Sequence, residues 1–149
     1  THGFTAGGTT DPTHRNEIDK FSFASNNNAT DVGDLTQART GTQGASSSTH
    51  GYIMSGYIAS PAGLTTRIDK FAFATNNNSS NIGDVTGTTG ASGGSCTSSV
   101  THGYMAGGPN NNAGYGHTIV RTSFSTDGDA VDTLQDLTHW MQGPGSCQE

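Results

Sequence analysis

The sequence has few residues of the kinds that build an ordinary globular core. Only 30% of its 149 residues are hydrophobic, and only 12% are charged. The low charge argues against ordinary disorder, which combines low hydrophobicity with high net charge. Glycine, serine, threonine and asparagine are abundant instead, as is typical where short strands alternate with tight turns. No stretch keeps the apolar period of a helix for more than one turn, so we expect an all-β fold.

Positive charge and long apolar runs are also scarce. Six Lys and Arg residues against twelve Asp and Glu give a formal net charge of −6, and the basic residues are scattered. This excludes the basic footprint of a nucleic-acid-binding protein and argues against an anionic membrane surface. No run approaches the roughly 18 apolar residues of a membrane span. No secretory signal is visible. Because the first residue falls inside a repeat, we expect the chain to be a piece of a longer protein.

Cysteine is limited to Cys96 and Cys147, which both follow a serine in glycine-rich surroundings. They occupy nearly equivalent positions in successive repeats. A disulfide between them, two buried thiols and metal ligation are all compatible with the sequence, which fixes neither connectivity nor compartment.

The chain is organised by an internal repeat. The stretch 18–36, IDKFSFASNNNATDVGDLT, returns at 68–86 as IDKFAFATNNNSSNIGDVT, with 12 identities in 19 positions, and 119–138 is a diverged third copy. A Thr-His-Gly-aromatic marker keeps the same spacing at residues 1–4, 49–52 and 101–104. A fixed period near fifty residues is typical of propellers and arrays. We divide the chain into modules 1–43, 44–94 and 95–143, followed by 144–149.

The second module is complete and predicts four short strands. We expect strands at 44–48, 52–57, 67–75 and 81–86, turns at 49–51 and 76–80, and a loop at 58–66. The fourth strand is expected at an edge. Within the third strand, Ile68, Lys70 and Ala72 are expected on one face, and Asp69, Phe71 and Phe73 on the other. Gly51 is expected to supply a positive φ in the turn. The stretch 129–141 is the one with some helical character, but it aligns with a fourth strand.

The order of these features resembles the kelch motif. A small-residue strand is followed by a turn, an aromatic and a diglycine, an Ile-Asp-x-Phe strand, and an Asp-Leu strand with an arginine after it. The residues that carry this pattern are Phe4, Tyr52 and Tyr104; Gly7-Gly8 and Gly107-Gly108; and Arg39. The second module departs with Ser55-Gly56, and Val32 and Ile82 stand near the place of the usual kelch tryptophan. The repeat sequences, with their Thr-His-Gly-aromatic and IDKF elements, are similar to those of repeats in virion structural and tail-fibre-like proteins of cyanobacterial and other aquatic phages.

This resemblance implies kelch-like β-propeller blades in which the first strand lines a central channel. The first module lacks that strand, and residues 144–149 are expected to supply one to a following or partner blade. Three blades fall below the usual minimum of about four. We therefore expect another chain or missing repeats to complete the ring. Two chains arranged head to tail would give six blades with twofold symmetry.

Histidines and aspartates recur in the repeats, and the repetition itself suggests a scaffold role. His2, His50 and His102 hold the same turn of different blades, too far apart to share a metal ion. Asp19 and Asp69, and the aspartates before the fourth-strand Leu or Val, are expected to make turn bonds that each blade needs. These are Asp34, Asp84 and Asp136. No hydrolase elbow, zinc-protease or phosphate-loop motif is present. We expect no catalytic residue, no metal and no cofactor.

The loops between the diglycine and the IDKF strand differ most between modules, and variable loops on a constant scaffold are where binding residues concentrate. The best contact candidates there are Tyr57, Arg67 and Tyr115. Three asparagines fit the N-glycosylation pattern at expected turns, which matters only in a glycosylating compartment. They are Asn28, Asn77 and Asn78.

The sequence therefore favours a structural or adhesive β-propeller module, without catalysis, in a virion appendage such as a tail fibre. Such a module is extracellular or on the virion surface and associates with itself or with other virion proteins. The alternative is a carbohydrate-binding propeller that recognises a host surface glycan. A fragment of a kelch-type oxidase is a third reading, which would require a copper site of Tyr and His ligands.

Overall fold

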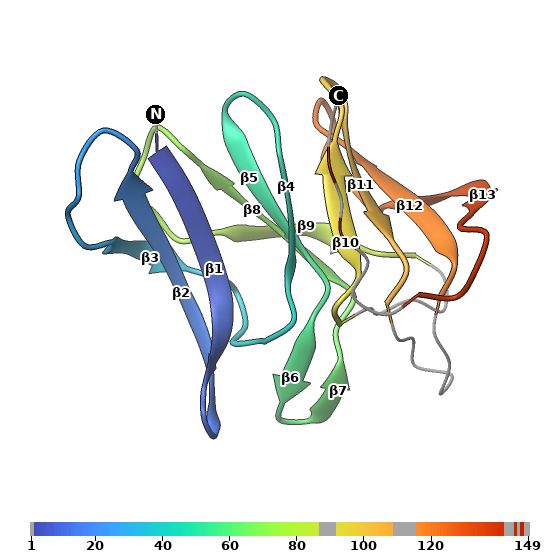
Figure 1. The fold of residues 1–149 in the computed structure, drawn as a ribbon, viewed down its shortest axis with the longest axis horizontal. Helices are drawn as coiled ribbons and strands as arrows, with labels where there is room; N and C mark the ends of the chain where they lie inside the picture. The colour runs from blue at the N-terminus through green and yellow to red at the C-terminus, as the bar shows by residue number, and fades with distance from the viewer. Residues whose placement is uncertain (1, 87–91, 109–115, 142–144, 146, 148–149) are drawn as a thin grey trace.

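The computed structural model describes residues 2–86, 92–108, 116–141, 145 and 147. Within these ranges the chain forms thirteen strands and no helix, and all strand pairing inside the sheets is antiparallel (Figure 1). The all-β class expected from the sequence is confirmed. Among the described residues, no helix has the length and apolar character needed to cross a membrane.

Three larger sheets follow one another along the chain, and in each the strands pair in the order in which they occur in the sequence. The first sheet contains β1 (His2–Thr10), β2 (Thr13–Ser22) and β3 (Thr30–Asp34), in that order. The second contains β4 (Gln43–Ser46), β5 (His50–Met54), β8 (Arg67–Ala72) and β9 (Ser80–Asp84). The third contains β10 (Ser95–Ser98), β11 (His102–Ala106), β12 (Thr118–Ser123) and β13 (Val131–Asp136). A two-stranded hairpin of β6 (Tyr57–Ala59) and β7 (Ala62–Leu64) extends from the second sheet.

The second sheet has the four strands expected of it, with β9 at an edge. Three details differ from the expectation. The strand expected at 52–57 begins at His50 and ends at Met54, and the expected loop 58–66 contains the β6–β7 hairpin. The two strands of this hairpin have three residues each, which is too short for an alternation of apolar and polar residues to be recognised in the sequence. The strand expected at 67–75 ends at Ala72, so Phe73 lies just beyond it. The stretch 129–141 contains strand β13 and no helix, as its alignment indicated.

The glycine of the Thr-His-Gly marker has a different role from the one expected. Gly51 lies within β5 rather than in a turn, and its φ is not positive. An added Cβ would overlap the ring of Phe71, its partner across β8, and Gly3 has the same relation to Phe21. The glycine is therefore required because an aromatic ring covers the strand at that point. The turn itself is formed by Ser47, whose hydroxyl accepts hydrogen bonds from the backbone N–H groups of Thr49 and His50.

The diglycine positions provide positive-φ backbone, which interrupts β1 with a bulge in the first module and follows the end of β5 and of β11 in the other two. Gly7 and Gly8 have φ values of 71° and 119°, and Gly107 and Gly108 have 67° and 91°. In the second module Ser55 adopts φ 58° before Gly56 at 123°, so the departure from diglycine preserves the conformation. A serine here carries the steric cost of the left-handed region, which glycine avoids.

Two apolar clusters join the sheets face to face. One lies between the first and second sheets, where Ile18 and Leu35 pack with Ile53 and Phe71. The other lies between the second and third sheets, where Tyr52 and Met54 pack among residues that include Met105 and Val120. Ile68 and Phe71 thus point to opposite neighbours, as the alternation in their strand predicts. The second sheet is covered on both faces, and the first and third are each covered on one.

Candidate functional site

The variable connections of the first two modules come together at one end of the molecule. The β1–β2 turn and the β6–β7 hairpin project from the same end, opposite the β4–β5 and β10–β11 turns (Figure 1). The ring of His14 on β2 meets the ring of Tyr57 on β6 edge to face, with centroids 5.9 Å apart. We call this region, formed by residues 8–15 and 56–67, the loop end. It is the place to which sequence reasoning assigned binding.

Two of the three predicted contact residues belong to the loop end. Tyr57 is 39% exposed on the β6–β7 hairpin, and Arg67 is exposed at the start of β8. Ile58, the next residue along β6, is buried, so Tyr57 faces away from the side that packs on the sheet. Tyr115 lies outside the described residues.

Arg67 lines an open cleft of about 430 Å³ beside the hairpin. The cleft has an apolar side formed by Ile58 and Leu64 and a polar side that includes Arg67 and Asp84. Thr66 donates a hydrogen bond of 2.8 Å from its hydroxyl to the Asp84 carboxylate, which fixes one wall. The volume lies within the range of small-ligand sites, and the mixed lining suits a polar ligand with an apolar face.

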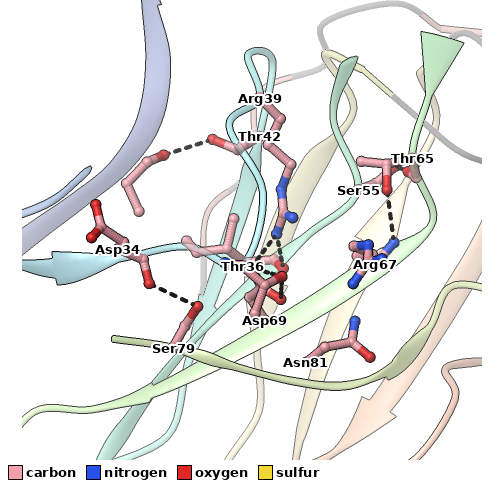
Figure 2. A network of polar contacts seen from close by, with 12 residues as sticks. Asp34, Thr36, Arg39, Thr42, Ser55, Thr65, Arg67, Asp69, Ser79 and Asn81 are labelled. Carbon is pink, nitrogen blue, oxygen red and sulfur yellow. Dashed lines mark hydrogen bonds and ion pairs between the residues drawn. The ribbon is translucent and has the colours of Figure 1, made fainter. Parts of the chain in front are cut away.

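A buried polar network ties the first sheet to the second (Figure 2). Asp69 on β8 accepts hydrogen bonds from the Thr36 backbone N–H at 2.8 Å and from the Thr36 hydroxyl at 2.7 Å. The Arg39 guanidinium lies 3.2 Å from the same carboxylate, and both side chains are fully buried. Arg39 also donates to the Ile53 carbonyl at 3.3 Å. Asp69 therefore has the scaffold role that its recurrence in the repeats suggested.

The electrostatics of this network are those of an ion pair held out of water. Burial lowers the pKa of the Arg39 guanidinium, and the neighbouring Asp69 carboxylate opposes that effect. Arginine stays charged in proteins even when its pKa falls. Within the described part of the chain, Nε and Nη1 of Arg39 have no hydrogen-bond partner. The buried guanidinium therefore has few hydrogen-bond acceptors besides Asp69, so each charge depends on the other for its stabilisation.

The histidines of the Thr-His-Gly marker act locally. The Thr49 hydroxyl lies 2.8 Å from Nδ1 of His50, and Thr101 lies 2.8 Å from Nδ1 of His102. His2 is exposed at the start of β1. Within the described ranges, no group of three or more His, Cys, Asp or Glu side chains is arranged to hold a metal ion.

The cysteines lie in unlike surroundings. Cys96 is on β10 and packs against the cluster between the second and third sheets, and this burial raises the pKa of its thiol. Cys147 is an exposed free thiol near the end of the chain. A disulfide between the two is one of the alternatives that the sequence leaves open, and the structure contains none between them.

The predicted glycosylation asparagines also differ in their surroundings. The side-chain oxygen of Asn78 accepts a 3.0 Å hydrogen bond from the Asp34 backbone N–H, so Asn78 contributes to the junction between the first two sheets. Asn28, its counterpart in the first module, is exposed. Asn77 is exposed as well, and its backbone lies close to Gly33.

Sequence reasoning missed the pairing of Arg39 with Asp69, because each residue belongs to a different module. In the third module, Val120 stands at the place of Asp69 and Met141 at the place of Arg39, as the equivalent backbone bonds from Gly8 to Arg39 and from Gly108 to Met141 indicate. Because Arg39 binds the aspartate of the sheet that follows its own, these two residues belong to different junctions and are not a replaced pair.

No protein-family model matches the chain, and no curated protein matches it either. Its function therefore has to be inferred from its own residues and geometry.

Proposed function

We propose that this chain is a non-catalytic structural and adhesive β-propeller module, part of a virion appendage such as a tail fibre, that binds its target through the loop end. The observation that carries the proposal is the repetition of one sheet-to-sheet junction, first between the first and second sheets and again between the second and third. Blades that stack by one repeated contact form the rigid scaffold on which propellers display loops.

The two junctions match in their aromatic and backbone contacts. Phe4 stacks on Phe73 with ring centroids 4.8 Å apart, and Tyr52 stacks on Phe124 at 4.7 Å. The Asp34 carbonyl accepts a bond of 2.8 Å from the Ser79 N–H. In the same way, the Asp84 carbonyl accepts a bond of 2.9 Å from the Ala130 N–H. Such equivalence supports a shared blade geometry, because identical contacts at equivalent positions set the same relation between neighbouring sheets.

The sequence differences between modules are concentrated in the connections that take no part in the junctions between sheets. The Thr-His-Gly and IDKF elements are built into strands and junctions, whereas the β1–β2 turn and the β6–β7 hairpin differ in length and sequence. Exposed aromatic and arginine side chains are the residues that most often dominate binding at protein surfaces. Tyr57 and Arg67 supply both kinds at the loop end.

Adsorption of fluorescently labelled protein to a panel of cyanobacterial and other aquatic bacterial cells tests this function. We expect saturable adsorption to some strains and its loss when Tyr57→Ala and Arg67→Ala are combined. Val100→Ser is the matched control, since Val100 is 93% exposed in the β10–β11 turn at the opposite end. Absence of adsorption to every strain, or adsorption that the loop variants leave unchanged, would count against the proposal.

A carbohydrate-binding propeller is the second candidate, and the cleft beside Arg67 favours it. Its guanidinium, carboxylate and amide groups lie next to apolar side chains, which matches the polar edges and apolar faces of a sugar ring. A glycan array decides this point. Binding to a defined glycan class that is lost in Arg67→Ala supports it, and an array without signal removes it.

A further inference from the structure

The first and third sheets each have one face that no other sheet of the chain covers. In the second sheet, both of the equivalent faces are buried in junctions. The first sheet presents Asp19, Phe21 and Phe23 outward, and the third presents Tyr104 and Ile119. We infer that these two faces bind each other in a second copy of the chain, head to tail, and that two copies close a ring of six sheets. The inference rests on the propeller architecture of the proposed function and adds the partner and the residues that join it.

Strand register shows that the outer faces are the two halves of the internal junction. Thr5 pairs with Asp19 in the first sheet as Ile53 pairs with Asp69 in the second. Phe21 and Phe23 therefore stand at the places of Phe71 and Phe73. On the other side, Ala106 pairs with Ile119 as Met54 pairs with Ile68, which places Tyr104 where the second sheet has Tyr52.

The series of aromatic stacks is incomplete at both ends. Inside the chain, Phe4 stacks on Phe73 and Tyr52 stacks on Phe124. Tyr104 is the counterpart of Phe4 and Tyr52 in the third sheet. Phe23, which is 70% exposed, is the counterpart of Phe73 and Phe124 in the first sheet. Terminal repeats that act as caps have polar outer faces, which this aromatic face does not resemble. Stacking of Tyr104 on Phe23 of a second copy completes the series.

The threonine donor and the aspartate acceptor of the internal polar network are present at these faces as well, whereas Met141 stands at the place of Arg39. Thr36 follows Leu35 and binds Asp69, while Arg39 lies over that carboxylate. Thr138 follows Leu137 in the third module at the equivalent position. Asp19, the counterpart of Asp69, borders an open cleft of about 540 Å³ on the outer side of the first sheet. The Thr138 hydroxyl of one copy is thus the natural donor to Asp19 of the other.

With three larger sheets in each copy of this 149-residue chain, two copies together reach the usual size of a propeller. Propellers contain about four to eight blades, and the chain provides three larger sheets. Two copies give six, whereas one copy or three copies fall outside that range. A head-to-tail contact that closes at two copies has twofold symmetry and leaves no outer face uncovered.

One corner of the junction between copies differs from the internal ones. Gly33 and Gly83 approach the backbone of the next sheet so closely that a Cβ would overlap it. Leu134, with φ 59° and 90% exposed, stands at this place in the third sheet. The contact between copies therefore relies on the Tyr104–Phe23 and Thr138–Asp19 pairs rather than on this corner. Leu134→Gly restores the internal pattern and is expected to preserve or tighten the assembly.

Multi-angle light scattering of the full chain over a concentration series tests the inference. We expect a species of twice the 15.3 kDa chain mass. Phe23→Asp and Tyr104→Ala should each shift it to the single-chain mass while circular dichroism shows an unchanged β spectrum. Val100→Ser is the control and should leave the mass of the assembly unchanged. Because the ring contains two identical junctions, a tenfold loss at each weakens assembly about 100-fold.

A folded wild-type monomer, a ladder of larger species, or a dimer that Phe23→Asp leaves intact would each overturn the inference. The adsorption assay separates this failure from failure of the proposed function. A monomer that still adsorbs to cells through Tyr57 and Arg67 overturns only the pairing of copies. A dimer sensitive to Phe23→Asp that adsorbs to nothing overturns only the adhesive role.

Discussion

Replacing Asp69 with valine should destabilise the protein strongly, because it leaves the Arg39 charge buried without its partner. The carboxylate is fully buried, lies 3.2 Å from the guanidinium and accepts the hydrogen bonds of Thr36. Removing one partner of a buried pair costs about 3–5 kcal/mol of unfolding free energy. At about 2–4 °C per kcal/mol for a chain of this size, the melting temperature should fall by on the order of 10 °C. Arg39→Met should cost a similar amount by leaving the carboxylate unpaired.

The double variant Arg39→Met, Asp69→Val should recover most of that loss. The third module has these residue types at the two positions, Met141 and Val120, although there the two positions belong to different junctions. Well-packed apolar replacements of buried ion pairs are often neutral or stabilising, so we expect the double variant to lie within about 1–2 kcal/mol of the wild type. Thr36 can then donate to the Ser79 carbonyl, as Thr86 donates to the Ala130 carbonyl at the next junction.

Urea unfolding of the wild type, both single variants and the double variant gives the coupling energy directly. All four are compared at one protein concentration, because assembly adds to apparent stability. Asp69→Asn is a useful fifth variant, since it keeps an acceptor for Thr36 but removes the charge. Single variants that cost less than about 1 kcal/mol, or a double variant that costs the sum of both, would refute the reasoning.

Three further predictions concern the repeated elements. Gly51→Ala should cost about 1–3 kcal/mol of stability in urea unfolding because its Cβ displaces the Phe71 ring, whereas Gly63→Ala, in open space, should cost much less. Asn78→Ala should lower the thermal stability by about 1 kcal/mol through loss of its bond to Asp34, while Asn28→Ala leaves the monomer unaffected; equal losses would contradict this. Burial raises the pKa of the Tyr52 phenol and of the Cys96 thiol, so the fold favours their neutral forms. The free energy of unfolding should therefore be constant below the unfolded thiol pKa of about 8.5 and should fall as the pH rises above it. Cys96→Ala should make this fall with pH less steep. An equally steep fall in the variant would argue against thiol burial as its cause.

Sequence reasoning predicted the features that depend on local pattern. Alternation along β8 correctly assigned Phe71 and Ile68 to opposite faces, and the asparagine run correctly marked the turn before β9. The repeat indicated four consecutive strands, which the second and third sheets contain.

The features it missed depend on packing between modules. Nothing near Gly51 in the sequence shows that the Phe71 ring will cover it, so a strand glycine was interpreted as a turn glycine. The partnership of Arg39 and Asp69 likewise exists only once two sheets meet. At the loop end, the sequence predicted Tyr57 and Arg67 as contact residues but did not predict the cleft that Arg67 lines. The walls of that cleft come from segments far apart in the chain.

The most direct test of a single repeated junction is an isotope-filtered NOE spectrum of a refolded equal mixture of ¹³C-labelled and unlabelled chains. Within each chain, cross-peaks should link Phe4 with Phe73 and Tyr52 with Phe124. Between chains, the account predicts cross-peaks from the Tyr104 ring of one copy to the Phe23 ring of the other. Intermolecular cross-peaks to other residues, or none at concentrations where the internal pairs are seen, would contradict it.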